Sequence, residues 1–141
     1  MPPVNENDLM VLARTIYGEA RGELDRNDGG LKSLQAIAWV VKNRMHQGRF
    51  GKSVADVCLQ PRQFSCWNED DPNRTHILNS TFENKILQIC FLTAAHVLFG
   101  DTADCTDGAD HYHSARIKTP TWAKDAKPTK KIANHIFYKL G

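Results

Sequence analysis

The sequence predicts an α+β fold in which helices build the core and a small antiparallel sheet or hairpin lies near the C-terminus. Most of the chain repeats apolar side chains at helical spacing, whereas its last part is aromatic and interrupted by prolines. The length of 141 residues, with 41% hydrophobic and 24% charged residues, is ordinary for a globular protein with a real core. No repeat or low-complexity linker divides the chain. We therefore expect one domain over residues 1–141.

The segment Leu9–Glu23, LMVLARTIYGEARGE, is predicted to form the first helix. Its apolar residues recur at steps of three and four, and they are Leu9, Leu12, Ala13, Ile16, Tyr17 and Ala20. Asn5 or Asn7 is expected to cap the start, and Gly22 is expected to end the helix. This places Glu19 in the last helical turn.

Glu19 is a candidate general acid because of this position. The negative end of a helix dipole disfavours a carboxylate, and burial among apolar neighbours raises the pKa of a carboxylic acid. Both effects suit an acid that works near neutral pH. The alternative is that Glu19 and Glu23 are solvated surface charges near Arg14 and Arg21. The helix pattern alone favours this alternative, because most surface carboxylates have no special role.

Two further helices follow in the first half of the chain. Residues 31–47 carry an apolar face, and Gly48 is the expected C-terminal cap. Ser53 and Asp56 read as a capping pair for a short helix over residues 54–59. The first two helices are expected to pack together, since each is apolar on one side.

The second half is expected to hold one long helix and then extended segments. Residues 69–79 read as an acidic, polar loop, followed by a helix from residue 79 or 80 to Phe99. Ser80 and Glu83 would form its capping box, and Gly100 would end it. Beyond it, the expected strands or extended segments are His111–Ala115, Thr119–Ala123 and His135–Leu140.

The net charge of +2 gives no argument for nucleic-acid binding. A solvated surface is the default explanation for the basic residues of the C-terminal part, which are Arg116, Lys118, Lys124, Lys127, Lys130, Lys131 and Lys139. No segment reaches the length of a membrane-spanning helix, so we expect no stable membrane insertion. The N-terminal MPPVNENDLM lacks the basic and apolar runs of a secretory signal, which predicts synthesis in the cytoplasm without a conventional export address.

The four cysteines, Cys58, Cys66, Cys90 and Cys105, stand at wide spacings that fit neither a zinc ribbon nor a redox motif. Free buried thiols are the default interpretation. Pairing of Cys58 with Cys66 and of Cys90 with Cys105 is the alternative for an oxidising periplasm, because each pair closes a short loop. The spacing leaves both states open.

The segment Gln60–Asn68, QPRQFSCWN, combines aromatic side chains with amide and hydroxyl groups. Such a mixture suits a cleft that stacks on sugar rings and hydrogen-bonds to their hydroxyl groups. The alternative is a loop in which Phe64 and Trp67 fill the core. The composition favours neither interpretation.

Metal-dependent and nucleophilic chemistry are both poorly supported by the motifs. His111 and His113 have the spacing of one strand face, and His135 is a third candidate ligand, but the sequence holds no HExxH. Hydrogen-bonding histidines around a cleft are the better interpretation, and we expect no metal and no cofactor. No serine stands in a GxSxG motif, and no cysteine has a recognised catalytic context.

Carboxylate chemistry remains. Most glycosidases pair an acid with a second carboxylate. The partners for Glu19 are candidates only by elimination, and they are Glu23, Asp70, Asp71 and Asp110. A lone acid still suffices when the substrate supplies its own nucleophile, because one residue can act first as acid and then as base.

Several motifs resemble the SleB-type cell wall hydrolases, which include spore cortex-lytic enzymes and phage and proteobacterial relatives. The motifs are ARTIYGEARGE, QAIAWVVKNRM, FGKSVADVCLQPRQFSCWN, GADHYHSARIKTPTWAK and IANHIFYK. They follow the family's order from about Leu9 to Lys139, and their agreement makes the resemblance specific.

This resemblance implies a lysozyme-like α+β catalytic domain that acts on peptidoglycan, typically as a lytic transglycosylase. The family's catalytic glutamate matches Glu19. Its implied role is to protonate the leaving oxygen of the β-1,4 bond between N-acetylmuramic acid and N-acetylglucosamine, and then to deprotonate the muramoyl C6 hydroxyl. The product is a 1,6-anhydro sugar, so no second carboxylate is needed. The alternatives are a hydrolytic muramidase or glucosaminidase and a glycan-binding module without activity. A zinc amidase is a more distant one.

The matching motifs also imply a substrate-binding cleft, whose residues are Phe64, Ser65, Trp67, Tyr112, His113 and Trp122. A core role is expected for His135, Phe137 and Tyr138. The expected partner is peptidoglycan, bound by a monomer. Spore enzymes of the family carry an export signal and a wall-binding repeat that this sequence lacks. We therefore expect a phage-type endolysin, released through a holin or carried in a virion, that acts on the cell wall from the periplasm.

Overall fold

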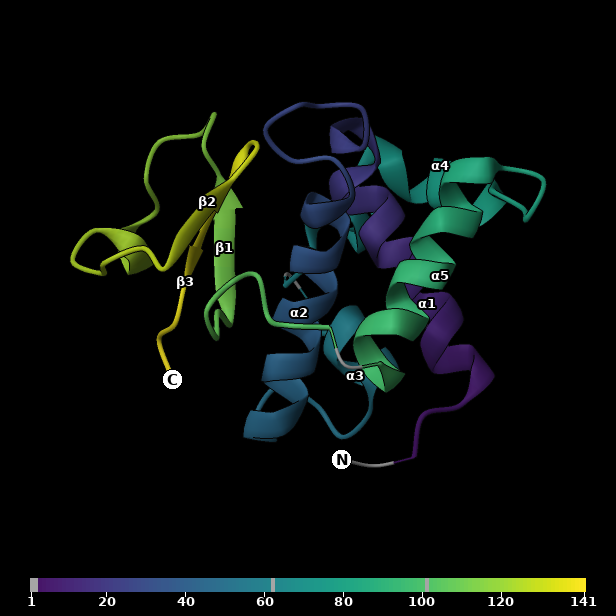
Figure 1. Ribbon diagram of the computed structural model, residues 1–141, viewed down its shortest axis with the longest axis horizontal. Helices are drawn as coiled ribbons and strands as arrows, with labels where there is room; N and C mark the ends of the chain where they lie inside the picture. The colour runs from purple at the N-terminus through teal and green to yellow at the C-terminus, as the bar shows by residue number, and fades with distance from the viewer. Residues whose placement is uncertain (1–2, 62, 101) are drawn as a thin grey trace.

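The computed structural model describes residues 3–61, 63–100 and 102–141. Its helices are α1 (Glu6–Ala20), α2 (Leu31–Gln47), α3 (Val54–Leu59), α4 (Pro72–Asn79) and α5 (Lys85–Phe99), with short 3-10 turns η1 (Arg21–Glu23), η2 (Ser65–Trp67) and η3 (Thr121–Ala123). Its strands are β1 (His111–Ser114), β2 (Lys130–Ile132) and β3 (His135–Tyr138). Figure 1 shows the helices on one side and the strands on the other, with α2 between them. The predicted α+β fold is confirmed.

Of the two expected caps, Asn5 and not Asn7 starts helix α1, which begins three residues before the predicted Leu9. The side chain of Asn5 accepts a hydrogen bond from the Asp8 backbone N–H (2.8 Å), and the Asp8 carboxylate accepts one from the Asn5 N–H (3.1 Å). The α-helix ends at Ala20, and the chain then tightens into η1, which contains Gly22. Glu19 therefore lies in the last turn of α1, as predicted.

Helices α2 and α3 have the predicted bounds. Gly48 follows α2 with a φ of 75°, a left-handed conformation that favours glycine, and its N–H donates to the carbonyl groups of Arg44 and Met45. The Ser53 hydroxyl accepts from the Asp56 N–H at the start of α3. These ends are set by residues close in sequence, which explains why the pattern locates them.

The predicted loop at residues 69–79 is wrong. This segment contains α4, because Asp71 caps the helix by accepting from the Asn73 N–H (2.8 Å) and Pro72 stands in its first turn. The predicted capping box of Ser80 is also wrong. Helix α5 begins at Lys85, and the Asn84 side chain caps it by accepting from two backbone N–H groups. The predicted end at Gly100 is confirmed.

The three strands form one antiparallel sheet in the order β1-β3-β2. Tyr112 of β1 stands opposite Phe137 of β3, and Lys131 of β2 stands opposite Ile136. The sequence pattern missed β2, which is only three residues long and mostly exposed. The predicted extended segment Thr119–Ala123 contains a turn of 3-10 helix instead.

Helix α2 connects the two parts because it is apolar on two sides. One side joins the large helical core through residues such as Leu34, Ile37 and Val41. Its other side contributes Ala36 and Val40 to a smaller core that the sheet completes, with Ala109, Ile132 and Phe137. The sheet is therefore held against the helices by packing on α2.

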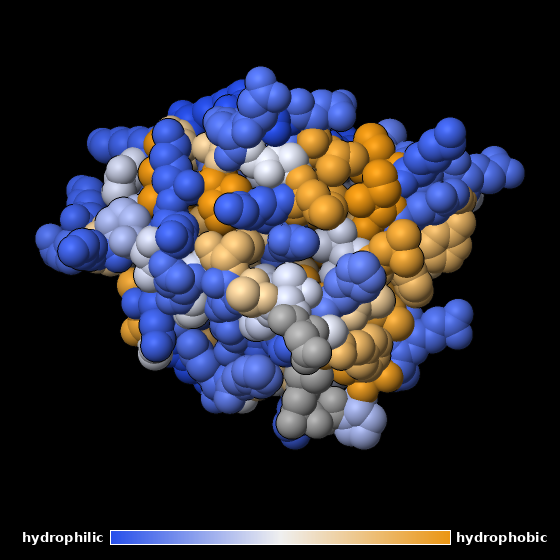
Figure 2. All heavy atoms as spheres, in the orientation of Figure 1, coloured by the Kyte–Doolittle hydropathy of each residue, from blue (hydrophilic) through white to orange (hydrophobic). Residues whose placement is uncertain are grey.

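The surface is largely hydrophilic in the view of Figure 2, with hydrophobic residues gathered over the helices around α5. The exposed large apolar side chains of α4, α5 and the turn between them are Leu78, Phe82, Leu92 and Phe99. Within the described residues, no helix is long and apolar enough to cross a membrane.

Candidate functional site

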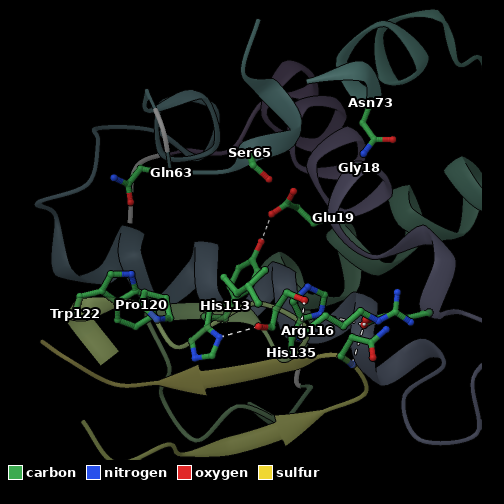
Figure 3. A pocket seen from close by; sticks show the side chains of 15 residues that line it. Gly18, Glu19, Gln63, Ser65, Asn73, His113, Arg116, Pro120, Trp122 and His135 are labelled. Atoms are coloured by element: carbon green, nitrogen blue, oxygen red, sulfur yellow. Dashed lines mark hydrogen bonds and ion pairs between the residues drawn. The ribbon is translucent and has the colours of Figure 1, made fainter. Parts of the chain in front are cut away.

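An open cavity of about 540 Å³ lies between the end of α1 and the sheet. Its lining comes from α1, η1, the segment around η2, α4 and the C-terminal part of the chain. The lining residues are Gly18, Glu19, Glu23, Gln63, Ser65, Asn73, Tyr112, His113, Ser114, Arg116, Ile117, Pro120, Trp122, Asn134 and His135. Figure 3 shows Glu19 and Ser65 on one side of the cavity, with His113 and Arg116 across from them.

Gly18, the neighbour of Glu19, lets η2 approach α1 closely. A Cβ atom at position 18 would lie 2.7 Å from the Cβ of Cys66 and would also overlap the end of Ile77. Glycine at this position is thus required by packing rather than by backbone conformation. The close approach brings Ser65 of η2 to the same cavity as Glu19.

The half-buried Glu19 carboxylate accepts a hydrogen bond from the hydroxyl of Tyr112 on β1. The Tyr112 ring packs against Phe64, Phe137 and His135, at centroid distances of 6.2, 5.6 and 5.1 Å. Burial and the adjacent carboxylate raise the pKa of Tyr112 well above its ordinary value, so its hydroxyl keeps its proton. Tyr112 is therefore a fixed hydrogen-bond donor to Glu19.

Glu23 also borders the cavity, but both oxygens of its carboxylate have hydrogen-bond partners in the protein. One oxygen lies 3.1 Å from the Nδ1 atom of His135, and the other accepts from the Asn134 N–H at 3.3 Å. Burial raises the pKa of Glu23, but the hydrogen bond and charge of His135 outweigh it and hold the pKa below its ordinary value. Glu23 thus joins η1 to β3 as an anion.

An aromatic wall closes the other end of the cavity. The exposed Trp122 contacts the rings of His111, His113 and Tyr138, with centroids 5.3 to 5.8 Å apart. His113 is held from both sides, by the Ser114 carbonyl at Nδ1 and the Tyr138 hydroxyl at Nε2, each at 2.9 Å. The indole of Trp122 is therefore exposed to solvent and held in place by the rings around it.

Five of the seven predicted site residues line this cavity: Glu19, Ser65, Tyr112, His113 and Trp122. Phe64 and Trp67 do not. Phe64 is 1% exposed and lies in the helical core, and the Trp67 indole N–H donates to the Thr15 hydroxyl at 2.8 Å. The placement of these two residues agrees with the interpretation of a loop that fills the core. His135, Phe137 and Tyr138 are all buried, as expected, and His135 also borders the cavity.

The structure separates the candidate second carboxylates. Asp71 caps α4, and Asp70 does not line the cavity. Asp110 is fully buried and accepts from His111, Gln47 and the N–H groups of Leu140 and Gly141. Burial raises the pKa of Asp110, but these hydrogen bonds outweigh it and hold the pKa at about 2. Glu23 is the one candidate at the cavity.

The thiols and histidines serve packing and hydrogen bonding. All four cysteines are free, which disagrees with the two pairings, and Cys58, Cys66 and Cys90 are buried as the default interpretation expects, whereas Cys105 is half-buried. Burial raises the pKa of the Cys58 and Cys90 thiols to about 12. In the described ranges, no group of three or more His, Cys, Asp or Glu residues is placed to hold a metal ion.

Sequence reasoning missed several polar residues of the cavity, and these are Gln63, Asn73, Ser114, Arg116 and Asn134. Gln63, Ser114, Arg116 and Asn134 stand inside the motifs that carry the family resemblance, which was the available signal. Asn73 gave none, because its segment was read as a loop. It lies on α4 and accepts from the Arg21 guanidinium at 2.8 Å.

A mostly helical core, a small antiparallel sheet and a cleft between them define a lysozyme-like domain. Comparison with known proteins agrees with this class. The catalytic domain of Bacillus cereus SleB superposes with a TM-score of 0.72 at 26% identity, covering 99% of this chain and 94% of that one. The catalytic domain of the germination-specific lytic transglycosylase SleB from Bacillus anthracis gives 0.73 at 25% identity, covering 99% of both chains.

The chain belongs to the Cell Wall Hydrolase family, whose model matches residues 30–138. This confirms the resemblance to SleB-type proteins. The spore cortex-lytic enzyme of Bacillus cereus is 27% identical over 135 residues, which are 96% of this chain and 45% of that protein. The enzyme of Bacillus subtilis strain 168 is 28% identical over 133 residues, covering 94% and 38%. The chain thus spans less than half the length of these relatives. Glu19 precedes the segment matched by the family model.

Proposed function

We propose that this domain is a peptidoglycan lytic transglycosylase that cleaves the bond between N-acetylmuramic acid and N-acetylglucosamine, with Glu19 as general acid and base. The observation that carries the proposal is the state of the two carboxylates at the cavity. Glu23 is bound to His135 and Asn134, whereas Glu19 faces the cavity and accepts a hydrogen bond from the neutral Tyr112 hydroxyl. Such a site suits a reaction that needs one working carboxyl group.

The proposed reaction begins with protonated Glu19. Tyr112 donates to one oxygen of the Glu19 carboxyl group, which leaves the other oxygen to give its proton to the glycosidic oxygen. As the bond from the muramoyl C1 atom breaks, positive charge develops on that sugar, and the new Glu19 carboxylate lies beside it. The carboxylate then takes the proton of the C6 hydroxyl while O6 bonds to C1. The products are a 1,6-anhydro end and a free N-acetylglucosamine end, and Glu19 is protonated again.

We assign the glycan to the cavity by its lining. The exposed Trp122 offers a flat apolar surface of the kind that packs on a sugar ring, and the Ser65 hydroxyl group borders the space beside Glu19. His113 supports Trp122 from behind. The names of the relatives support the substrate, since they describe cortex-lytic enzymes and a lytic transglycosylase.

The alternatives differ in what they need from the cavity. A hydrolase needs a base that activates water, and Glu23 is the remaining carboxylate in the described lining. Its two hydrogen-bond partners weaken it as a base, because they stabilise its anion. A glycan-binding module needs neither glutamate for its binding. The endolysin role, the route to the wall and the monomeric state stay predictions from the sequence.

The test is mass spectrometry of the sugars that the protein releases from purified peptidoglycan. We expect muropeptides that end in 1,6-anhydromuramic acid, and we expect Glu19→Gln to lower the rate by about a thousandfold, since general acid–base catalysis contributes roughly 10²–10⁴. Glu83→Gln is the matched control, because Glu83 is exposed and lies outside the cavity lining.

Each other result points to a different function. Reducing ends of normal mass that also vanish with Glu19→Gln would replace the transglycosylase by a hydrolase and direct attention to Glu23. Retained binding to peptidoglycan with no soluble sugar from the unmodified protein would leave the binding module. Equal activity of the Glu19→Gln and Glu83→Gln variants would remove Glu19 from the mechanism.

A further inference from the structure

Among the residues that the structure describes, Arg116 is the one lining residue with a permanent positive charge, and the proposed reaction does not use it. It stands just beyond β1, in a turn fixed by two hydrogen bonds. The Ser114 hydroxyl accepts from the Arg116 N–H at 3.1 Å, and the Ala115 N–H donates to the Asn134 carbonyl at 2.6 Å. Figure 3 shows Arg116 on the sheet side of the cavity, across from Glu19 and Ser65.

The guanidinium of Arg116 is free to bind a ligand. Among the described residues it forms no ion pair and no side-chain hydrogen bond, although two carboxylates line the same cavity. Glu23 is held by His135 and Asn134, and Glu19 by Tyr112. A guanidinium offers a planar set of donors that matches a carboxylate, so an arginine left open at a cleft is suited to an anionic ligand.

The segment that begins with Arg116 is mainly positively charged. Residues 116–131 contain six Lys and Arg residues and one acid, Asp125. The opposite wall begins after the acidic run Glu69–Asp71, which precedes α4. The excess of positive charge in this segment favours an anionic ligand beside Arg116.

We propose that Arg116 is a specificity-determining residue that binds a carboxylate carried by the muramic acid unit, so that the preferred substrate is a glycan with anionic substituents. This inference rests on the proposed function. Two parts of peptidoglycan supply such a carboxylate: the lactyl group of a bare muramic acid, and the acidic stem peptide attached to it. Both present the same chemistry to the guanidinium.

The test uses three forms of one glycan: intact peptidoglycan, glycan strands freed of peptides by an amidase, and such strands with the lactyl carboxylates converted to methylamides. Cleavage rates are measured for the unmodified protein and for Arg116→Gln, Arg116→Lys and Lys124→Gln. Lys124 is the matched control, because it is an exposed cation of the same segment outside the cavity lining.

We expect Arg116→Gln to lower kcat/KM by about tenfold on a carboxylate-bearing glycan, the usual order for a charge-assisted hydrogen bond. Arg116→Lys keeps the charge without the planar donor set, so its loss should be about threefold. On the methylamide glycan, the unmodified protein and Arg116→Gln should have equal rates. A loss on intact peptidoglycan alone assigns the stem peptide, and a loss on the stripped strands assigns the lactyl group.

An equal loss on all three forms would overturn the inference, because it would mean that Arg116 only supports the fold. No loss on any form, or the same loss with Lys124→Gln, would overturn it as well. Failure of the proposed function is seen separately, since the unmodified protein would then release no anhydro sugar from any of the three forms.

Discussion

The helical part of the molecule and its C-terminal sheet are held by different means. The helices enclose a large apolar core in which side chains such as Ile37 and Leu87 have no exposed surface. The sheet shares a core of five buried residues with α2, and much of its order comes from polar groups such as Asp110 and the His135–Glu23 pair. Glu19 belongs to the first part and Tyr112 to the second. The cavity lies between the helical part, which an apolar core holds together, and the sheet, which is held largely by hydrogen bonds.

The largest difference between the two parts should be seen in core truncations. Ile37→Ala in the helical core should lower the free energy of unfolding by about 4 kcal/mol, because its tightly packed site cannot collapse around the missing atoms. Ile132→Ala, at the edge of the sheet, should cost about 2 kcal/mol. Denaturant unfolding measures both values, with the exposed Leu92→Ala as control. Equal losses of unfolding free energy for the two isoleucine variants would contradict a difference in packing between the helical core and the sheet.

Asp110 should give the sheet part a pH dependence. Its pKa is lowered from an ordinary value of 3.8 to about 2. A carboxyl group with a lowered pKa stabilises the folded state above the unfolded-state pKa, and this contribution is lost as the pH falls through the folded-state pKa. Stability should thus fall between about pH 4 and pH 2 by roughly 2 kcal/mol from this group, since one pKa unit is worth about 1.4 kcal/mol.

Asp110→Asn should lose this contribution at neutral pH and should flatten that part of the pH profile. Thermal unfolding at a series of pH values measures it. Glu23, whose pKa is also lowered, adds to the same trend, so some pH dependence should remain in the variant. A variant profile parallel to that of the unmodified protein would assign the acid sensitivity to other groups.

The smallest effect concerns the hydrogen bond that Tyr112 of the sheet donates to Glu19 of α1 across the cavity. Tyr112→Phe keeps the ring that packs on Phe64 and Phe137 and removes the donor hydroxyl. We expect kcat to fall about tenfold with KM nearly unchanged, because Tyr112 positions Glu19 rather than holding the glycan in the ground state. Steady-state rates on soluble glycan strands give the two constants. A rise in KM alone would instead make Tyr112 a binding residue.

Local signals predicted the parts of the fold that local physics decides. The apolar spacing in α1 and α2 and the Gly48 cap were predicted correctly, and the cap of α1 was narrowed to Asn5 or Asn7, because each depends on residues within a few positions. Helix α4 was missed because its sequence is polar and its one buried residue, Ile77, packs on a distant part of the chain. The start of α5 was misplaced because two plausible caps, Ser80 and Asn84, compete in the sequence.

The sequence by itself determined the class of fold, the place of Glu19 in the last turn of α1 and the family resemblance that directs attention to it. Only the tertiary structure decided that Tyr112, 93 residues away, donates to Glu19, that Glu23 is bound to His135, and that Phe64 is core whereas Trp122 borders the cavity. Spacing along a chain encodes which residues share a helix face or a strand face. Which faces then meet depends on the packing of α2 between helices and sheet, and that packing sums many contacts between segments far apart in the sequence.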